Sequence, residues 1–351
     1  MKWWTQEEAD IIRREAPLME QSGALSSDVL TIIYRHRLFK LFIPPGMDGA
    51  MQPLPDAIKV FEEAARLDGS FGWLVTIGAG GGYFAGVFTP EMAAKLFTPA
   101  EAVVAGSGYV SGEATCVDGG YRVSGSWRYC SGADHATIFT ANCNISGTDQ
   151  IRSFIFTPGQ VTIQHDWDAH GLKATGSHTI SVSDVFVPWQ MTFDIANGRR
   201  SDDAVIYRYP FIAFAEVSFA AVCAGICRHY LEEAAILTEG YNRADDTTAL
   251  KRYLTVTEMI RRQQEALNAE IARFYHALEI SWRLMLDDGI VADAVYEEVG
   301  SRSRILTTVA LTAAQAVYPW LGLGAAMQHS TINRIWRDLH TASQHILLKE
   351  F

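Results

Sequence analysis

The sequence predicts an α+β protein with three successive parts: helices, then a small β-domain, then a second set of helices. Two observations predict this class. The spacing of apolar residues changes from helical to strand-like and back, and an Asp-Gly turn lies between two β-favouring runs. The order differs from the strand and helix alternation of a doubly wound sheet. We expect an N-terminal helical domain over residues 1–100, a middle β-barrel or sandwich over 101–192 and a C-terminal helical bundle over 193–351.

The N-terminal and C-terminal regions carry apolar residues three and four positions apart, which is typical of helices that bury one face. In the N-terminal region these residues include Ile58, Phe61, Ala64 and Ala65. In the C-terminal region a long stripe contains Ile260, Leu267, Ile271, Phe274, Leu278, Trp282 and Met285. Residues 294–318 and 328–348 predict two more helices, so the C-terminal region is expected to be a bundle.

The middle region begins with a hairpin signal. Residues 115–117 and 121–123 favour strands, and Asp118-Gly119 between them is typical of a two-residue turn. Later segments are short, rich in Ile, Val, Phe and Thr, and bounded by Gly, Pro or Asp. These further strands are predicted at residues 136–141, 153–156 and 178–187.

Charge and cysteine content restrict the partners and the compartment. The 29 Lys and Arg against 40 Asp and Glu give a net charge of −11, which argues against nucleic acid or anionic lipid as a partner. Five cysteines without a Cys-x-x-Cys pair favour a reducing cytoplasm. Residues 71–88 and 211–227 are apolar, but glycines in the first and Glu216 in the second favour burial in a protein core over a membrane span. Acidic residues near the N-terminus argue against a secretory signal.

Two clusters are better explained without a ligand. The glycines of residues 78–86 do not match G-x-G-x-x-G in either register and follow helical sequence, so we expect close helix packing or room for backbone beside a ligand. His165, Asp166, Asp168 and His170 could hold a metal ion if they converged, but alternation along an extended segment separates them. We expect a polar loop there and no metal site.

The segment 125–136 carries the strongest signal for a ligand. Trp127, Tyr129 and Ser131 alternate along a predicted strand and are expected to share one face. A flat heterocycle could lie against the two aromatic rings while the Ser131 hydroxyl bonds to an edge nitrogen. An aromatic core strand explains the same alternation.

Several motifs resemble the acyl-CoA dehydrogenase superfamily. They are Gly-Leu-Lys-Ala-Thr-Gly-Ser at 171–177, the strand ending at 184–188, Asp-Gly-Ser-Phe-Gly-Trp at 68–73, Trp-Arg-Tyr-Cys-Ser-Gly at 127–132, and the final segment 333–345. Together with the order of helices, sheet and helices, they look most like the oxygenase component of two-component flavin monooxygenases, as in p-hydroxyphenylacetate hydroxylase and the steroid-degradation hydroxylases. The resemblance covers nearly the whole chain.

The resemblance implies a cytoplasmic homotetramer that receives reduced FMN or FAD from a separate flavin reductase. With O2 as co-substrate, a C4a-hydroperoxyflavin then hydroxylates an aromatic or mainly apolar small molecule. Carried over by position, Ser131 contacts the flavin N5 region as a catalytic residue, and Trp127 and Tyr129 lie along the ring. Thr175 and Ser177 reach the phosphate or ribityl side of the flavin.

His345 is the second implied catalytic residue, as a base or proton relay over the flavin. A histidine suits this role because its ordinary pKa lies near neutrality. A second interpretation makes His345 a cation at the C-terminus of the last helix. Asp338 is expected to be structural, paired with Arg334 or Arg337.

The sequence departs from the family pattern in three places, which leaves alternatives open. The dehydrogenases place a catalytic Glu where this chain has Gln344 and His345, so a dehydrogenase or oxidase would need its base on another helix. No histidine lies between His36 and His135, where some relatives have one. The Arg-x-x-Phe-Gly segment that holds FAD in many members is not recognisable near residues 241–254. A flavin-free assembly protein that retains the fold is the third interpretation.

Overall fold

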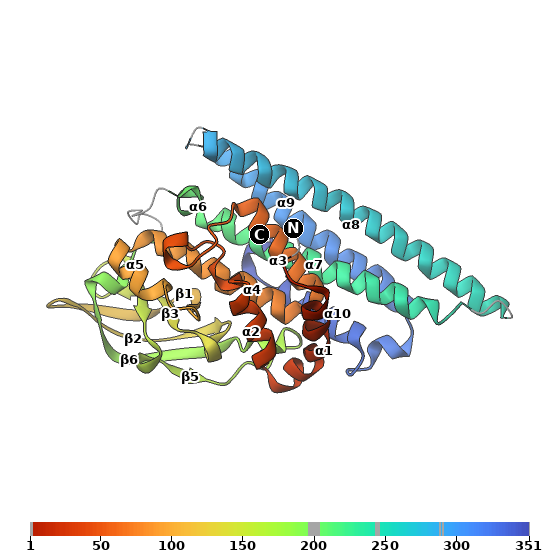
Figure 1. The fold of residues 1–351 in the computed structure, drawn as a ribbon, viewed down its shortest axis with the longest axis horizontal. Coiled ribbons are helices and arrows are strands. Elements are labelled where there is room, and N and C mark those ends of the chain that lie inside the picture. Colours follow the sequence, from red (N-terminus) through yellow and green to blue (C-terminus); the bar gives the residue numbers. More distant parts are fainter. Residues whose placement is uncertain (1–2, 196–203, 243–245, 288, 290, 351) are drawn as a thin grey trace.

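A computed structural model describes residues 3–195, 204–242, 246–287, 289 and 291–350. Figure 1 shows the strands gathered at one end of the molecule and α7, α8 and α9 extending toward the other, with α3 and α4 between the strands and these long helices. The order of helices, sheet and helices confirms the α+β class. The proposed domain boundaries stay predictions.

The N-terminal region is helical, and its helices start at residues suited to that position. Thr5 begins α1 with a capping box in which Glu8 takes part, and the Asp68 carboxylate accepts the Phe71 N–H at the start of α4. The helices are α1 (Gln6–Ser22), α2 (Ser27–Arg35), α3 (Leu54–Leu67), α4 (Gly69–Gly81) and α5 (Pro90–Phe97). The glycine-rich end of α4 packs closely: a Cβ at Gly81 would lie 2.4 Å from Val104. This confirms close packing as the use of that glycine.

The middle region forms a seven-stranded sheet with the order β5-β6-β2-β1-β3-β4-β7. Its strands are β1 (Val104–Val117), β2 (Gly120–Cys130), β3 (Ile138–Ile145), β4 (Ile151–Phe156), β5 (Thr162–Gln164), β6 (His178–Pro188) and β7 (Thr192–Phe193). β1 and β2 pair antiparallel across the predicted turn, where Gly119 has φ +78°. β4 also contacts β6, although three strands separate them in the sheet, so the sheet curls around its own core.

The C-terminal region contains the predicted long helices. They are α6 (Val205–Arg208), α7 (Phe211–Glu239), α8 (Thr247–Asp287), α9 (Asp293–Val317) and α10 (Thr331–Ala342). The apolar stripe that ends at Met285 is buried along α8. The last helix is shorter than expected: α10 ends at Ala342, so His345 follows the helix and caps the 3-10 turn η10 (Ile346–Leu348).

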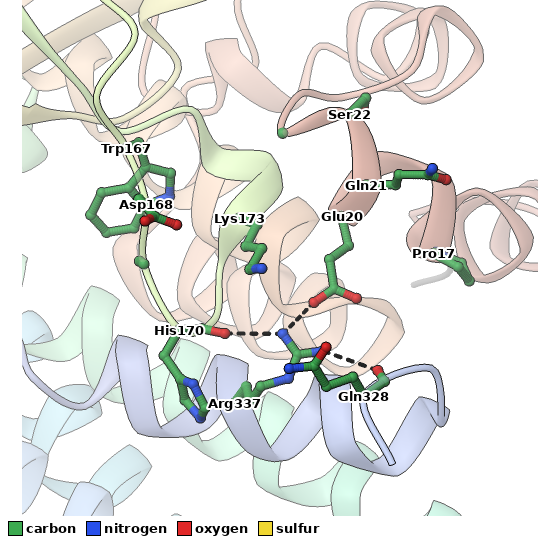
Figure 2. A pocket seen from close by; sticks show the side chains of 12 residues that line it. Pro17, Glu20, Gln21, Ser22, Trp167, Asp168, His170, Lys173, Gln328 and Arg337 are labelled. Carbon is green, nitrogen blue, oxygen red and sulfur yellow. Dashed lines mark hydrogen bonds and ion pairs between the residues drawn. The ribbon is translucent and has the colours of Figure 1, made fainter.

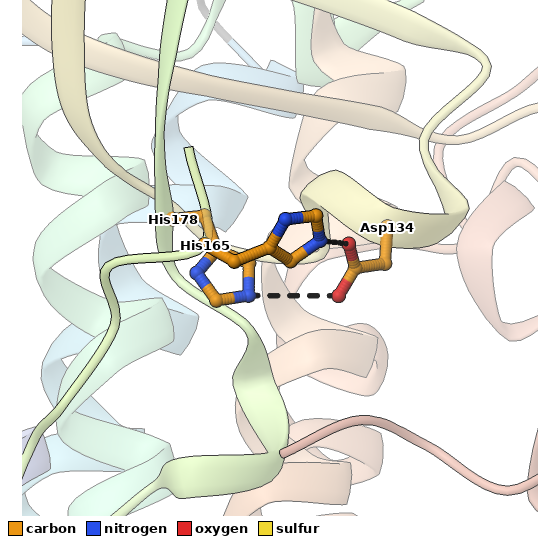
Figure 3. A group of neighbouring side chains, drawn as sticks. All are labelled: Asp134, His165 and His178. Carbon is orange, nitrogen blue, oxygen red and sulfur yellow. Dashed lines mark hydrogen bonds and ion pairs between the residues drawn. The ribbon is translucent and has the colours of Figure 1, made fainter. Parts of the chain in front are cut away.

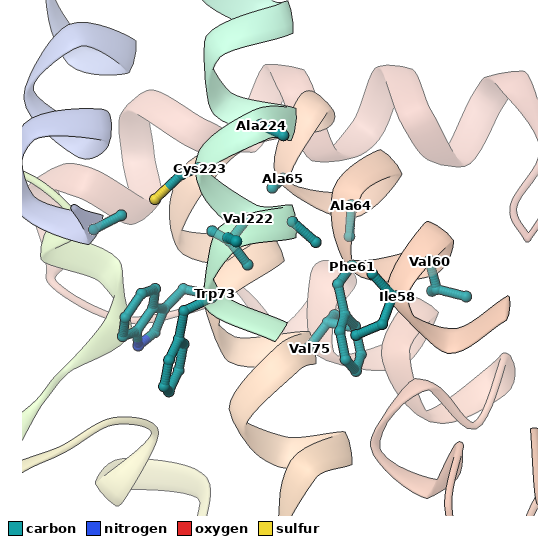
Figure 4. Packing of buried hydrophobic residues seen from close by; sticks show 14 of the residues in the cluster. Ile58, Val60, Phe61, Ala64, Ala65, Trp73, Val75, Val222, Cys223 and Ala224 are labelled. Atoms are coloured by element: carbon teal, nitrogen blue, oxygen red, sulfur yellow. The ribbon is translucent and has the colours of Figure 1, made fainter. Parts of the chain in front are cut away.

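The core joins α3, α4 and α7, whose facing side chains are mostly small or aliphatic (Figure 4). Gly225 allows α7 to touch α3 closely, since a Cβ there would lie 2.1 Å from the Glu62 carbonyl oxygen. Among the described residues, α7 has the length and composition of a membrane span, but 83% of its most apolar window is buried in the protein. It also packs against α9 and α10, as expected for a core helix.

Candidate active site

Three of the predicted site residues, Ser131, Thr175 and Ser177, lie together in one hydrogen-bonded chain. The Ser131 Oγ and Ser177 Oγ are 2.8 Å apart, and the Ser177 Oγ and Thr175 Oγ1 are 2.7 Å apart. The Thr175 hydroxyl donates to the Leu172 carbonyl at 2.7 Å. All three hydroxyl residues are buried. The Gly132 N–H also donates to the Thr175 carbonyl at 2.8 Å, so the end of β2 and the turn η6 (Lys173–Thr175) are held together.

Trp73 connects this chain to His345. The Trp73 Nε1–H donates to the Ser131 Oγ at 3.0 Å, and its ring stacks on Phe219 with centroids 5.1 Å apart. The Phe219 and His345 centroids are 3.9 Å apart, and those of Trp73 and His345 are 6.2 Å apart. Ser131 and His345 therefore belong to one cluster, although they come from the β-domain and from the end of the chain.

Sequence reasoning missed the site positions of Trp73 and Phe219. Trp73 lies in the 68–73 motif, which contributed to the resemblance without a role for the tryptophan. Phe219 lies inside the continuous apolar stretch of α7, where almost every side chain is buried. Nothing in such a stretch distinguishes a residue that packs from one that lines a site.

The environment of His345 favours the neutral imidazole. Burial lowers the pKa of His345 to about 4. Its Nδ1 accepts the Leu347 N–H in a long contact of 3.4 Å, which puts the ring proton on Nε2 in this arrangement. The interpretation of His345 as a helix cation is wrong, because α10 ends at Ala342 and burial disfavours the charged form.

The prediction that Trp127, Tyr129 and Ser131 share one face is also wrong. Tyr129 has φ +68°, and the pairing of β2 with β6 shifts register between Trp127 and Cys130. This bulge breaks the alternation on which the prediction rested. Trp127 is fully buried in the β-domain core and donates to the Asn142 carbonyl at 2.9 Å, whereas Tyr129 is 47% exposed. Trp127 is thus an aromatic core residue and has no surface for a flavin.

Asp338 supports the site through a hydrogen bond to the backbone. Its Oδ1 accepts the Leu172 N–H at 2.6 Å, so α10 holds the residue whose carbonyl ends the hydroxyl chain. Burial and the charge of Asp68 raise the pKa of Asp338. Of the expected partners, Arg337 binds Glu20 instead, whereas the charge of Arg334 acts on Asp338 as well as on Asp68, from which its Nε lies 3.8 Å.

One group of described residues has the composition of a metal site. Asp134, His165 and His178 each offer a ligand atom, all within 4.8 Å of one another (Figure 3). However, the Trp167 backbone N–H donates to the His178 Nδ1 at 3.1 Å. The proton of neutral His178 must then be on Nε2, the atom that faces Asp134, whereas a metal-bound histidine donates from its outer nitrogen. The group is better described as a hydrogen-bonded support for the loop that follows Ser131.

A pocket of about 580 Å³ lies between the end of α1, the segment 167–173 and α10 (Figure 2). Lys173, Glu20 and Arg337 turn their charged ends toward this space. Arg337 is already bonded to Glu20 and to the His170 carbonyl. Walls with charges of both signs do not suit an apolar aromatic molecule. The cluster of Trp73, Phe219 and His345 is therefore the better candidate for the place where such a molecule binds.

Comparison with known proteins identifies the relatives of this chain. Residues 217–350 match the family model for the acyl-CoA dehydrogenase C-terminal domain. Indole-3-acetate monooxygenase of Pseudomonas putida is 28% identical over 97% of this chain and 88% of that protein. The flavin-dependent monooxygenase oxygenase subunit HsaA of Mycobacterium tuberculosis is 25% identical over 95% of this chain and 88% of that protein.

Solved structures agree on the fold. The crystal structure of 3-HSA hydroxylase from Rhodococcus sp. RHA1 superposes with a TM-score of 0.91 at 20% identity, covering 97% of this chain and 91% of that chain. XiaF from Streptomyces sp., in complex with FADH2 and glycerol, superposes with a TM-score of 0.83 at 20% identity, covering 98% and 90%. The chain thus shares the fold of these solved structures, residues 217–350 resemble the acyl-CoA dehydrogenase C-terminal domain, and the predicted resemblance to the oxygenase components of flavin-dependent monooxygenases is confirmed.

Proposed function

We propose that this chain is the oxygenase component of a two-component flavin-dependent monooxygenase that hydroxylates an aromatic or mainly apolar small molecule. The observation that carries the proposal is the continuous cluster of Ser131, Trp73, Phe219 and His345, which combines a buried hydroxyl, two aromatic rings and a neutral imidazole. The curated relatives, which include an indole-3-acetate monooxygenase and an oxygenase subunit, support it.

The residues present fit a flavin. An isoalloxazine is a flat, largely apolar ring system with polar nitrogens and oxygens at its edges, and the cluster places two aromatic rings next to a buried hydroxyl. Reduced flavin, when bound, supplies the two electrons that activate O2. The proposal covers FMN and FAD alike, and residues 243–245, part of the region expected to hold FAD in relatives, lie outside the described residues.

The protein groups contribute binding, dryness and control of one proton. Ser131 would hold a bound flavin by a hydrogen bond to an edge nitrogen. Trp73 and Phe219 exclude water from the reacting atoms, which protects a reactive oxygen species from hydrolytic side reactions. His345 holds a proton at Nε2. It would donate this proton to a substrate oxygen while Nδ1 takes up another proton, once the long contact of Nδ1 to the Leu347 N–H opens, so the imidazole stays neutral.

A single-turnover experiment tests this function. The purified protein is mixed with chemically reduced FMN or FAD and ¹⁸O2 in the presence of a panel of indoles and phenols. We expect a transient flavin absorbance distinct from the reduced and oxidised forms, and one labelled oxygen atom in the product. Anaerobic bleaching of tightly bound FAD by an acyl-CoA would instead identify a dehydrogenase. Intact protein that binds neither reduced nor oxidised flavin would identify an assembly protein.

His345→Ala separates chemistry from binding in the same experiment. We expect this variant to lose more product than flavin affinity, because the imidazole packs against Phe219 and Trp73 and is not a member of the hydroxyl chain that ends at Ser131. Equal loss of both would assign His345 to structure.

We further propose that the protein works as a cytoplasmic homotetramer supplied by a separate flavin reductase. The name oxygenase subunit for the relative HsaA supports the division between two components. The cysteines of the chain are all free, and four of the five are buried. Light scattering tests the tetramer, and the absence of NADH or NADPH oxidation by the protein with flavin alone tests the need for a reductase.

A further inference from the structure

The hydroxyl chain that ends at Ser131 has a direction that the contacts themselves determine. Three oxygen–oxygen contacts of 2.7 to 2.8 Å join the Leu172 carbonyl, Thr175, Ser177 and Ser131. Each contact needs one proton, since two oxygens this close without one would repel. The three hydroxyls supply three protons and the carbonyl supplies none. Only one arrangement satisfies all three contacts: Ser131 donates to Ser177, Ser177 to Thr175, and Thr175 to Leu172.

Both ends of the chain reinforce this direction. The Leu172 carbonyl can only accept, and it is held in place by the Trp167 Nε1–H, which also donates to it at 3.0 Å. At the other end, the Trp73 Nε1–H can only donate, and it occupies one lone pair of the Ser131 Oγ. Ser131 has therefore used its proton and one lone pair. Its remaining hydrogen-bonding capacity is one lone pair, which accepts.

We propose that Trp73, Ser177 and Thr175 are positioning residues that make Ser131 an obligate hydrogen-bond acceptor, so that the site selects a flavin whose N5 carries a proton. This inference rests on the proposed function, which puts the flavin edge at Ser131. N5 of a reduced flavin bears a hydrogen and can donate to Ser131. N5 of an oxidised flavin has only a lone pair, and Ser131 could donate to it only by abandoning its contact with Ser177.

The selection can be measured by binding, without turnover. The dissociation constants of reduced and oxidised FMN are determined anaerobically for the wild type and for Ser177→Ala, Thr175→Val and Ser131→Ala. Ser177→Ala removes the acceptor of the Ser131 proton. Thr175→Val keeps the shape of the side chain but lets the Ser177 hydroxyl turn back toward Ser131. Either change frees the Ser131 proton for the ligand.

We expect the ratio of the oxidised to the reduced dissociation constant to fall about fivefold in Ser177→Ala and in Thr175→Val, the factor that one net hydrogen bond supplies. Tighter binding of oxidised FMN should account for most of the change. The midpoint potential of bound FMN should fall by about 20 mV, which is the same fivefold change for a two-electron couple. Ser131→Ala should lower the ratio by weakening the reduced form instead. Ser153→Ala, an equally buried serine on β4, is the matched control and should leave the ratio unchanged.

The outcomes distinguish a failure of the proposal that Ser131 is an obligate acceptor from a failure of the proposed function. If the ratio of dissociation constants stays within twofold of the wild type in both Ser177→Ala and Thr175→Val, the proposal that Ser131 is an obligate acceptor is overturned, whatever Ser131→Ala does. Flavin binding in the same experiment would still support the proposed function. If the wild-type protein binds neither reduced nor oxidised flavin, both the proposed function and the proposal that Ser131 is an obligate acceptor are overturned.

Discussion

The buried imidazole of His345 predicts a measurable pH dependence of stability. Burial lowers the pKa of His345 to about 4 in the folded protein, whereas an unfolded histidine titrates near 6.5. Above pH 6.5 both states are neutral at this residue. As the pH falls below 6.5, the unfolded state takes up a proton that the folded state refuses, so stability is lost until about pH 4.

The size of the effect follows from the same shift. Each pKa unit corresponds to about 1.4 kcal/mol, so His345 should remove about 2 kcal/mol from the free energy of unfolding between pH 7 and pH 5. His345→Gln cannot take up this proton and so lacks this loss of stability. Urea denaturation of both proteins at half-unit steps should therefore show the wild type losing about 2 kcal/mol relative to the variant over that range. The buried residues His135 and His229 titrate in both proteins, so their effects cancel in the difference.

The comparison needs one control, and one result would refute the reasoning. His276→Gln replaces an exposed histidine on α8 and should follow the wild type at every pH. A constant difference between wild type and His345→Gln from pH 7 to pH 5 would refute the burial of a neutral imidazole. It would also remove the reason for regarding His345 as an uncharged proton relay.

Three substitutions test other contacts. Trp73→Phe keeps the ring on Phe219 but loses the N–H to Ser131, and it should lower the free energy of unfolding by about 1 kcal/mol in a denaturant titration. Gly69→Ala would bring a Cβ to 2.8 Å from the Asp338 Cβ and should cost about 1 to 3 kcal/mol by the same measurement. Trp127→Ala should cost about 3 to 5 kcal/mol, seen as a lower denaturation midpoint, because the ring fills the β-domain core.

Each of these has a comparison variant or a result that would contradict it. Gly80→Ala lies in the same helix as Gly69, but its Cβ would be 3.8 Å from Phe214, so it should be tolerated. Equal stability of the two alanine variants would contradict the close contact at Gly69. A Trp127→Phe protein with normal stability but weakened flavin binding would reverse the assignment of Trp127 to the core. Unchanged stability of Trp73→Phe would mean that its hydrogen bond to Ser131 adds nothing to the folded state.

Local patterns predicted the elements of the fold that local interactions decide. The Asp118-Gly119 hairpin and the apolar stripe along α8 could be predicted directly, because a turn and a helix face depend on residues near in sequence. The bulge at Tyr129 could not, since it arises from the register of β2 against β6. A one-residue change in register moves a side chain to the other face.

The candidate site was predictable only where polar residues carried it. Ser131, Thr175 and Ser177 stood out by motif, and the structure brings them together. The direction of their hydrogen bonds depends on the Leu172 carbonyl and on Trp73, which lie in quoted motifs that gave neither residue a role. Apolar and backbone groups join a site only when the fold positions them, so sequence patterns alone do not reveal them.

The hydrogen bond from the Leu172 N–H to Asp338 affects any attempt to divide the protein into fragments. Asp338 belongs to α10, Leu172 to the β-domain, and Gly69, whose missing side chain makes room for the Asp338 carboxyl, to the start of α4. Separate expression of the three segments would leave an acid in contact with solvent on one piece and an unanchored loop on another. We expect such fragments to recover the Ser131 geometry only when they are recombined, which makes complementation between fragments a sensitive report on whether the whole site has assembled.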